Sequence, residues 1–101
     1  MLTTEQKQRL KDQLTQTLAG EREVCRIVIF GSFLHSDDPH DLDVAVFQDS
    51  AEGYLPLALK YRRKTRQIAR IIPVDIIPLK ANGEDGFFLD EIEQGETVYE
   101  R

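Results

Sequence analysis

The spacing of apolar residues predicts helices and strands in alternation along the chain. Near the N-terminus, leucines recur every fourth residue among polar side chains, at Leu10, Leu14 and Leu18. This spacing is typical of one face of an amphipathic helix. Thr3 or Thr4 can cap its first turn, and Gly20 suits its end. We therefore expect a helix over about residues 4–19.

Two short runs of β-branched and apolar residues predict buried strands. The runs are Val24–Phe30 and Leu42–Phe47. The segment that joins them is too short for a helical crossover, so we expect the two strands to pair antiparallel or within a mixed sheet. Within that segment, His35–Asp41 has the Asp, Ser and Pro content of a turn-rich loop.

The second half of the chain predicts two helices and two strands. A helix is expected from about Pro56 to Arg70, with apolar residues at helical spacing, namely Leu55, Leu59, Ile68 and Ile72. Val74–Leu79 predicts a strand, and Pro78 favours a place at a sheet edge or near the strand's end. We then expect a loop, a short helix and a short terminal strand, over Ala81–Gly86, Phe87–Glu93 and Thr97–Tyr99 respectively.

Composition narrows the class of protein. The chain has 101 residues, of which 41% are hydrophobic, which is enough for one modest core. No apolar run approaches the roughly 18 residues of a membrane span. The single cysteine, Cys25, excludes an intrachain disulfide and a cysteine-based zinc site. We therefore expect a cytoplasmic protein with one α+β domain over residues 1–101, built as a small mixed β-sheet packed with helices.

Charge is distributed unevenly along the chain. The formal net charge is −5, which disfavours nucleic acid as a partner without excluding it. Yet the segment Ala58–Ile72 contains six basic residues and no acidic one. Three interpretations stay open for this segment: a solvated helix face, a surface that attracts a nucleotide or a tRNA end, and a docking face for an acidic partner.

Three aspartates are candidates for catalytic chemistry. Asp41 and Asp43 flank Leu42 at the start of the second strand. Because residues i and i+2 of a strand share a face, their carboxylates should project together about 6–7 Å apart. Asp75 lies in an otherwise apolar strand, where an unpaired carboxylate is costly. A cation shared by all three would relieve both problems, and oxygen ligands favour Mg²⁺ bound with substrate phosphates. The aspartates therefore predict a two-metal phosphoryl-transfer site.

Gly31 and Ser32 end the first strand and are candidates for phosphate binding. Glycine allows a close approach of the backbone, and the following amides with the Ser32 hydroxyl can surround a phosphate. The alternative for Ser32 is an ordinary turn at the end of a strand. For the aspartates the alternatives are a turn residue, an exposed edge-strand residue and a cap. Other polar residues of the loop are expected to cap it or to face solvent, namely His35, Asp37, Asp38 and His40.

In these residues the chain resembles the DNA polymerase β nucleotidyltransferase superfamily. The matching parts, in order, are Phe30-Gly31-Ser32, Asp41-Leu42-Asp43 and Val74-Asp75-Ile76. Its small size is similar to that of the minimal nucleotidyltransferase (MNT) group. One departure is Phe33-Leu34-His35, which stands where many relatives carry a basic residue, so phosphate contact would come from His35 or elsewhere. The spacer of eight residues between Ser32 and Asp41 is also shorter than in many relatives.

The resemblance implies a polymerase β-like fold and an Mg²⁺-dependent transfer of AMP from ATP to a hydroxyl acceptor. It implies that Asp41 and Asp43 hold two Mg²⁺ ions, and that Asp75 shares one ion and helps to activate the attacking hydroxyl. Gly31 and Ser32 would bind the β- and γ-phosphates of the nucleoside triphosphate.

The resemblance also implies a protein partner. Many minimal nucleotidyltransferases are encoded with a small helical HEPN protein and act as antitoxins by binding it, by adenylylating it, or both, so a HEPN-type protein is the expected partner. The candidate acceptors are a protein tyrosine or serine, as on the HEPN-type partner, an RNA 3′ end and a small molecule. One alternative is a non-catalytic antitoxin that neutralises its partner by forming a complex. Another is a freestanding transferase of the antibiotic-resistance type that acts on a small molecule. Neither the acceptor nor the oligomeric state follows from the sequence.

Overall fold

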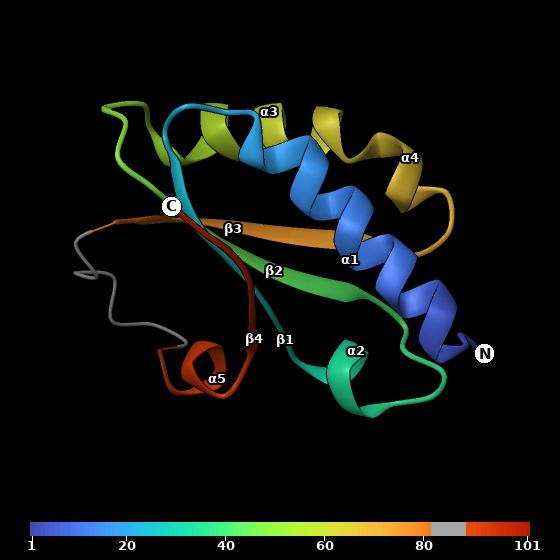
Figure 1. Ribbon diagram of the computed structural model, residues 1–101. Coiled ribbons are helices and arrows are strands. Elements are labelled where there is room, and N and C mark those ends of the chain that lie inside the picture. The colour runs from blue at the N-terminus through green and yellow to red at the C-terminus, as the bar shows by residue number, and fades with distance from the viewer. Residues whose placement is uncertain (82–88) are drawn as a thin grey trace.

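Helices cover both faces of a mixed β-sheet (Figure 1). The computed structural model describes residues 1–81 and 89–101, without the side chain of Leu89. In chain order the elements are α1 (Thr4–Ala19), β1 (Val24–Phe30), α2 (Ser32–His35), β2 (Leu42–Gln48), α3 (Tyr54–Lys64), α4 (Arg66–Ala69), β3 (Val74–Lys80), α5 (Leu89–Glu93) and β4 (Glu96–Glu100). Figure 1 shows α1, α3 and α4 on one side of the sheet and α5 on the other, and α2 follows the end of β1, with its Phe33 in the same core cluster as the leucines of α1. The predicted α+β class is confirmed.

The described strands form one four-stranded sheet in the order β3-β2-β1-β4. β1 pairs antiparallel with both β2 and β4, whereas β2 and β3 are parallel. The prediction that the first two strands pair antiparallel or in a mixed sheet is confirmed. β3 lies at an edge, where the backbone N–H groups that face away from β2 have no strand to pair with, so proline is tolerated at such positions. This edge position accommodates Pro78, as the sequence predicts.

α1 begins with a reciprocal capping box. The Thr3 hydroxyl accepts a hydrogen bond from the Gln6 amide at 3.0 Å, and the Gln6 side chain accepts one from the Thr3 amide at 2.8 Å. Two of the amide groups left unpaired at a helix start are thereby satisfied. The predicted span of this helix is confirmed, and its three spaced leucines are buried.

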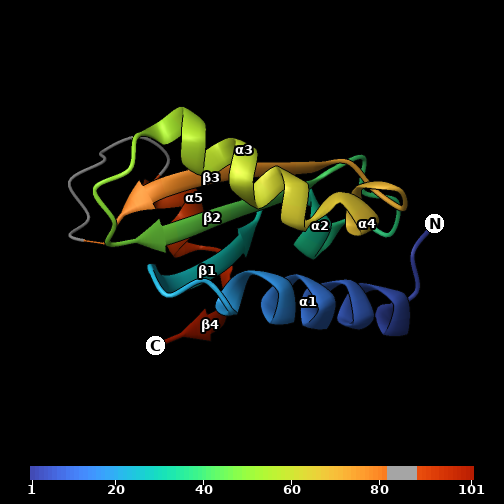
Figure 2. The same cartoon turned by 90° about the horizontal axis from the view of Figure 1, so that it is seen from above.

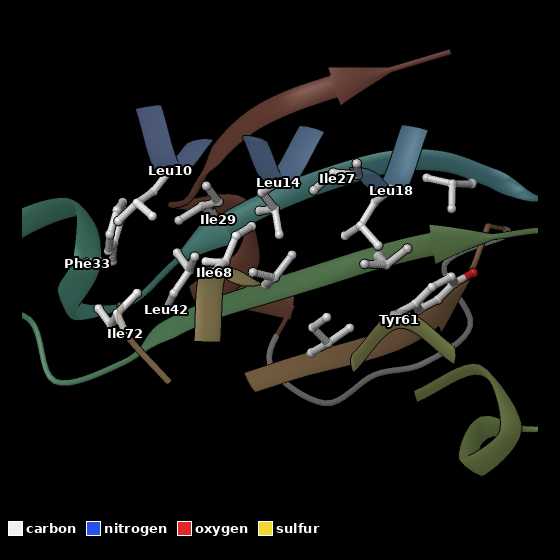
Figure 3. Close-up of a cluster of buried hydrophobic side chains, with 14 of the residues drawn as sticks. Leu10, Leu14, Leu18, Ile27, Ile29, Phe33, Leu42, Tyr61, Ile68 and Ile72 are labelled. Carbon is white, nitrogen blue, oxygen red and sulfur yellow. The ribbon is translucent and has the colours of Figure 1, made fainter. Parts of the chain in front are cut away.

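Most of the hydrophobic core lies between the sheet and the layer of α1, α3 and α4. Leu14 and Leu18 of α1 are fully buried and belong to one cluster with Ile27 of β1 and Tyr61 of α3 (Figure 3). A smaller cluster covers the other face of the sheet, where Ile92 of α5 packs with side chains of β1, β2 and β3. This second face is the one that carries the candidate site.

The predicted helix from Pro56 to Arg70 is wrong in two respects. It is interrupted at Thr65, whose hydroxyl donates to the Tyr61 carbonyl oxygen at 2.9 Å, and it continues as the short α4. In addition, Leu55 and Leu59 lie outside the core, with 64% and 45% of their surface exposed. The buried side chains of α3 are instead Leu57, Ala58 and Tyr61, because the bulky Tyr61 packs against the sheet and orients the helix.

The C-terminal part of the fold agrees with the sequence where it is described. α5 ends at Glu93, as predicted, and the terminal strand extends one residue beyond the predicted range at each end. The loop predicted over Ala81–Gly86, apart from Ala81, and the predicted helix start at residues 87–88 lie outside the described residues. Among the described helices, none combines the length and apolar character that a membrane crossing requires.

Candidate active site

Strand pairing brings the three predicted aspartates together. Asp43 lies directly opposite Asp75 in the parallel register of β2 and β3. Asp41 precedes β2 by one residue, and the alternation of strand side chains places it on the same side as Asp43. That side is shared with Ala45 and Phe47, which belong to the smaller core beneath α5. The cluster therefore lies at the end of β2 and β3, on the face opposite α1, α3 and α4.

The three carboxylates are close enough to share a cation. Each offers an oxygen, and these oxygens all lie within 4.8 Å of one another. Asp41 and Asp43 are half-buried, and Asp75 is exposed. Within residues 1–81 and 89–101, none of the three carboxylates has a hydrogen bond or an ion pair with another side chain. An all-oxygen donor set of this kind suits Mg²⁺ or Mn²⁺, with substrate phosphates completing the coordination.

The electrostatics of the cluster favour a bound cation. Burial, followed by the negative charges of Asp41 and Asp75 and that of Glu91, raises the pKa of Asp43 from 3.8 to about 6. A divalent cation between the carboxylates would offset this repulsion and stabilise the ionised form of Asp43. The site residues therefore fit the metal ions that the sequence predicts.

Glu91 is a member of the site's charge environment that sequence reasoning missed. It lies in the first turn of α5, far from the aspartates in the sequence. In the sequence, Glu91 stands out only as an acidic residue near the start of a predicted helix. Such a residue is ordinarily explained by its favourable interaction with the helix dipole, not by a place in an active site. Its proximity to Asp43 depends on the packing of α5 against the sheet.

Gly31 lets the Asp43 carboxylate approach the turn after β1. The Gly31 backbone has φ 80° and ψ −156°, a combination that residues with a side chain rarely adopt. A Cβ atom at this position would lie 2.5 Å from Oδ2 of Asp43. Glycine is thus required here both by its backbone conformation and by the neighbouring carboxylate. Phosphate binding by Gly31 itself stays a prediction.

Ser32 begins the short α2 and is exposed beside this turn. Its hydroxyl has no hydrogen bond with any part of the chain that the structure describes. Lys7 of α1 donates to the Ser36 carbonyl oxygen and lies 5.5 Å from the ring centre of Phe33. These contacts tie α2 to α1, so that Ser32 is presented next to Gly31 from an anchored turn.

The other polar residues of the predicted loop lie outside the aspartate cluster. Asp38 pairs with the N-terminal amine of Met1 at 3.4 Å, consistent with the expected surface role. His35 and His40 are exposed. The described residues contain one group of His, Cys, Asp or Glu side chains close enough to hold a metal ion, and neither histidine belongs to it.

Comparisons with known proteins agree on the family. The family model described as polymerase beta, nucleotidyltransferase, matches residues 12–101. No curated protein matches the sequence. Among solved structures, the chain is similar to one in a crystal structure of a mutant of the toxin–antitoxin pair MntA–HpeT, with a TM-score of 0.69 and 15% identity over 90% of this chain and 73% of that one.

A second similar structure is a complex of a tri-AMPylated HEPN toxin from Shewanella oneidensis with its MNT antitoxin. The TM-score is 0.64, and the identity is 18% over 94% of this chain and 73% of the other. At these identities the likeness concerns the fold: the polymerase β-like arrangement of a mixed sheet with helices is confirmed.

Proposed function

The chain belongs to the polymerase β nucleotidyltransferase family, and from that premise we propose that it transfers AMP from ATP to a hydroxyl of a partner protein. The observation that carries this proposal is the meeting of Asp41, Asp43 and Asp75, whose carboxylate oxygens lie within 4.8 Å of one another. Such a group at the end of two parallel strands has the composition of a two-metal phosphoryl-transfer site.

Each residue of the site has a distinct role in this proposal. Asp41 and Asp43 would hold two Mg²⁺ ions, with Asp75 sharing one, and the ions would neutralise the triphosphate and polarise the α-phosphoryl group. Gly31 leaves room for the carboxylate of Asp43. The exposed Ser32 hydroxyl beside it would donate to the β- or γ-phosphate.

The proposed step is an in-line displacement at the α-phosphorus of ATP. The acceptor hydroxyl oxygen forms a bond to this phosphorus, and the bond to the bridging oxygen of the β-phosphate breaks, so pyrophosphate leaves. The hydroxyl proton passes to the Asp75 carboxylate or to water. Asp75 suits this role because it is the exposed member of the group, open to an acceptor from outside. The chain's own contribution is positioning and charge compensation.

A HEPN-type protein is the acceptor and partner in this proposal, and the pair would act in the cytoplasm as a toxin and its antitoxin. Support comes from the two similar solved structures, both toxin–antitoxin assemblies, one of which contains a HEPN toxin described as tri-AMPylated. The alternative function, neutralisation by complex formation alone, does not require all three aspartates to converge. Their convergence, together with the Gly31 conformation that permits it, favours the enzyme.

The proposal is tested by incubating the chain with a HEPN-type protein from the same organism, Mg²⁺ and ATP labelled at the α-phosphate. Label should enter the HEPN-type protein, whereas label from γ-phosphate ATP should not. Asp43→Asn and Asp75→Asn should each lower the rate by at least about a hundredfold. Asp38→Asn, an exposed aspartate of the same loop outside the cluster, is the matched control and should leave the rate unchanged.

Formation of a stable complex without label transfer by the wild-type chain would contradict the enzyme and support the non-catalytic antitoxin. Incorporation of label into RNA instead of protein would contradict the acceptor but keep the chemistry.

A further inference from the structure

A stripe of exposed residues lies on the outer side of α3 and reaches the start of α4. It consists of Leu55, Leu59, Arg62 and Arg66, and we refer to it as the outer stripe. Leu55, Leu59 and Arg62 are spaced i, i+4 and i+7 and share one face of α3, and Arg66 opens α4 just after the interruption at Thr65. The buried residues Leu57 and Tyr61 occupy the opposite face. Figure 2 shows α3 and α4 following one another alongside α1.

The first half of the outer stripe is apolar and open to solvent. Leu55 and Leu59 have 64% and 45% of their surface exposed, although α3 already buries a separate apolar face against the sheet. A single exposed leucine needs no explanation. Two on one stripe, one turn apart and followed directly by arginines, form the kind of mixed surface that protein partners bind.

Two glutamates neutralise one flank of the basic segment Ala58–Ile72. Glu21 and Glu23 lie beside α3, and Lys60 pairs with both at 3.3 and 3.0 Å. Lys64 pairs with Glu21 at 2.7 Å. The repulsion expected within the basic segment is therefore partly relieved inside the chain itself, on the flank that faces the turn after α1.

The arginines of the segment remain without such partners. In the part of the chain that the structure describes, no hydrogen bond or ion pair reaches the side chains concerned, which are Arg62, Arg63, Arg66 and Arg70. Four guanidinium groups on a short helical segment repel one another, and a guanidinium matches a carboxylate in a two-pronged hydrogen bond. The carboxylates of an acidic partner would therefore relieve the repulsion between the arginines, and their hydrogen bonds with the guanidinium groups would orient the partner.

A hollow beside the outer stripe extends the basic surface toward α1. Its volume is about 410 Å³, and it is lined by Arg63, Arg66 and Arg70 on one side and by Gln13 and Thr17 of α1 on the other. Guanidinium groups donate and cannot accept hydrogen bonds. The hollow is thus suited to carboxylate side chains that reach in from a helix lying along the outer stripe.

We propose that the outer stripe and the adjacent hollow dock an amphipathic helix of another protein, which offers apolar side chains to Leu55 and Leu59 and carboxylates to the arginines. Helix-in-groove recognition uses anchors at this spacing. The aliphatic half and the absence of an aromatic residue from the outer stripe favour a protein over single-stranded nucleic acid, which binds by stacking on aromatic rings.

A second copy of this chain could supply acidic side chains to the arginines only from a surface other than the outer stripe. Such a head-to-tail contact forms rings or open filaments instead of a closed pair. The docking surface lies on the face of the sheet opposite the aspartate cluster. A bound helix would therefore leave that cluster free, and the inference does not depend on the transfer chemistry.

The test uses a fluorescein-labelled peptide of about 18 residues, stapled to be helical and close to the roughly 24 Å length of α3 and α4. On one face of the helical peptide, the N-terminal half carries leucines one turn apart and the C-terminal half carries glutamates. A second peptide carries the same residues with the two halves exchanged. Fluorescence anisotropy should show saturable binding of one of them at low salt. Leu55→Ser and Arg66→Glu should each weaken this binding by about tenfold.

Arg66→Glu is compatible with the fold because Arg66 opens α4, where an acidic side chain is favourable. Its matched control is Arg22→Glu, an exposed arginine in the turn after α1, which changes the net charge equally and should alter binding by less than about twofold. Absence of saturable binding of either peptide, or equal weakening by both reversals, would overturn the proposal.

Two further outcomes would assign the surface to another occupant. Tighter binding of a labelled single-stranded RNA, lost on Arg66→Glu, would overturn the protein-docking proposal in favour of RNA. Concentration-dependent self-association in size-exclusion chromatography, lost on the same change, would overturn it in favour of a second copy. Unchanged Mg²⁺-ATP binding by Arg66→Glu is expected in every case, which separates this proposal from that for the aspartate site.

Discussion

Replacing Asp43 by asparagine should stabilise the metal-free protein at neutral pH. Asparagine has the shape of the aspartate but removes the charge that burial disfavours and that Asp41, Asp75 and Glu91 repel. The rise of the Asp43 pKa from 3.8 to about 6 corresponds to about 3 kcal/mol of cost for the ionised carboxylate. Because Asp43 is only half-buried, solvent screening reduces this to about 1–2 kcal/mol.

The sign of the effect defines its dependence on pH. The pKa of Asp43 is higher in the folded chain than in the unfolded one, so the folded state binds more protons between about pH 4 and pH 6. The contribution of Asp43 to wild-type stability should therefore fall as the pH rises through this window, and this loss should be absent from Asp43→Asn. The variant should exceed the wild type by about 1–2 kcal/mol at pH 7.5, and the two should converge near pH 4.

Urea unfolding in the presence of a chelator, at several pH values between 4 and 7.5, measures this difference directly. Asp38→Asn is the control, because its exposed pair with the N-terminal amine is worth at most about 1 kcal/mol and its loss can only destabilise. Adding Mg²⁺ should reverse the order, since binding to the folded state stabilises the wild type and not the variant. A variant less stable than the wild type at pH 7.5 without metal, or a difference that does not change with pH, would refute the reasoning.

The remaining predictions concern the turn, the core and the first helix cap. Gly31→Ala should cost about 1–3 kcal/mol from backbone strain and displace Asp43, so thermal unfolding and Mg²⁺-ATP calorimetry should both show a loss; Gly20→Ala, at an ordinary helix end, should show neither. Leu14→Ala should lower the free energy of unfolding by about 2–5 kcal/mol, because the side chain is fully buried; a cost under about 1 kcal/mol would contradict the described core. Thr3→Ala should cost about 1 kcal/mol in urea unfolding through loss of the capping box, and no change would mean that α1 frays at this end.

The elements near the N-terminus were predictable because their signals are local. Leucines every fourth residue with a capping threonine define α1, and runs of β-branched residues define β1 and β2. The same locality explains the success with Asp41 and Asp43, since alternation along a strand places both carboxylates on one face. Each of these inferences needs only residues within a few positions of one another.

The errors in the second helix have a physical origin as well. Apolar spacing alone is compatible with either Leu55 and Leu59 or Leu57 and Tyr61 facing inward, because both pairs are one turn apart. Which pair faces inward depends on how the helix packs against the sheet. Tyr61 is fully buried, and its hydroxyl donates a hydrogen bond to Glu23 at 2.8 Å, so the face with Leu57 and Tyr61 is turned inward. The exposed leucines of the outer stripe follow from that choice.

The residue types of the site, the local elements that carry them and the all-oxygen chemistry of three aspartates can be inferred from the sequence alone. The tertiary fold was needed to establish that β3 lies parallel to β2 with Asp75 opposite Asp43. It also decided that α5 brings Glu91 near the same carboxylate, and that Glu21 and Glu23 pair with one flank of the basic segment. The physical reason is range: periodicity and capping act between neighbours in the chain, whereas strand order and charge pairing depend on how the whole core packs.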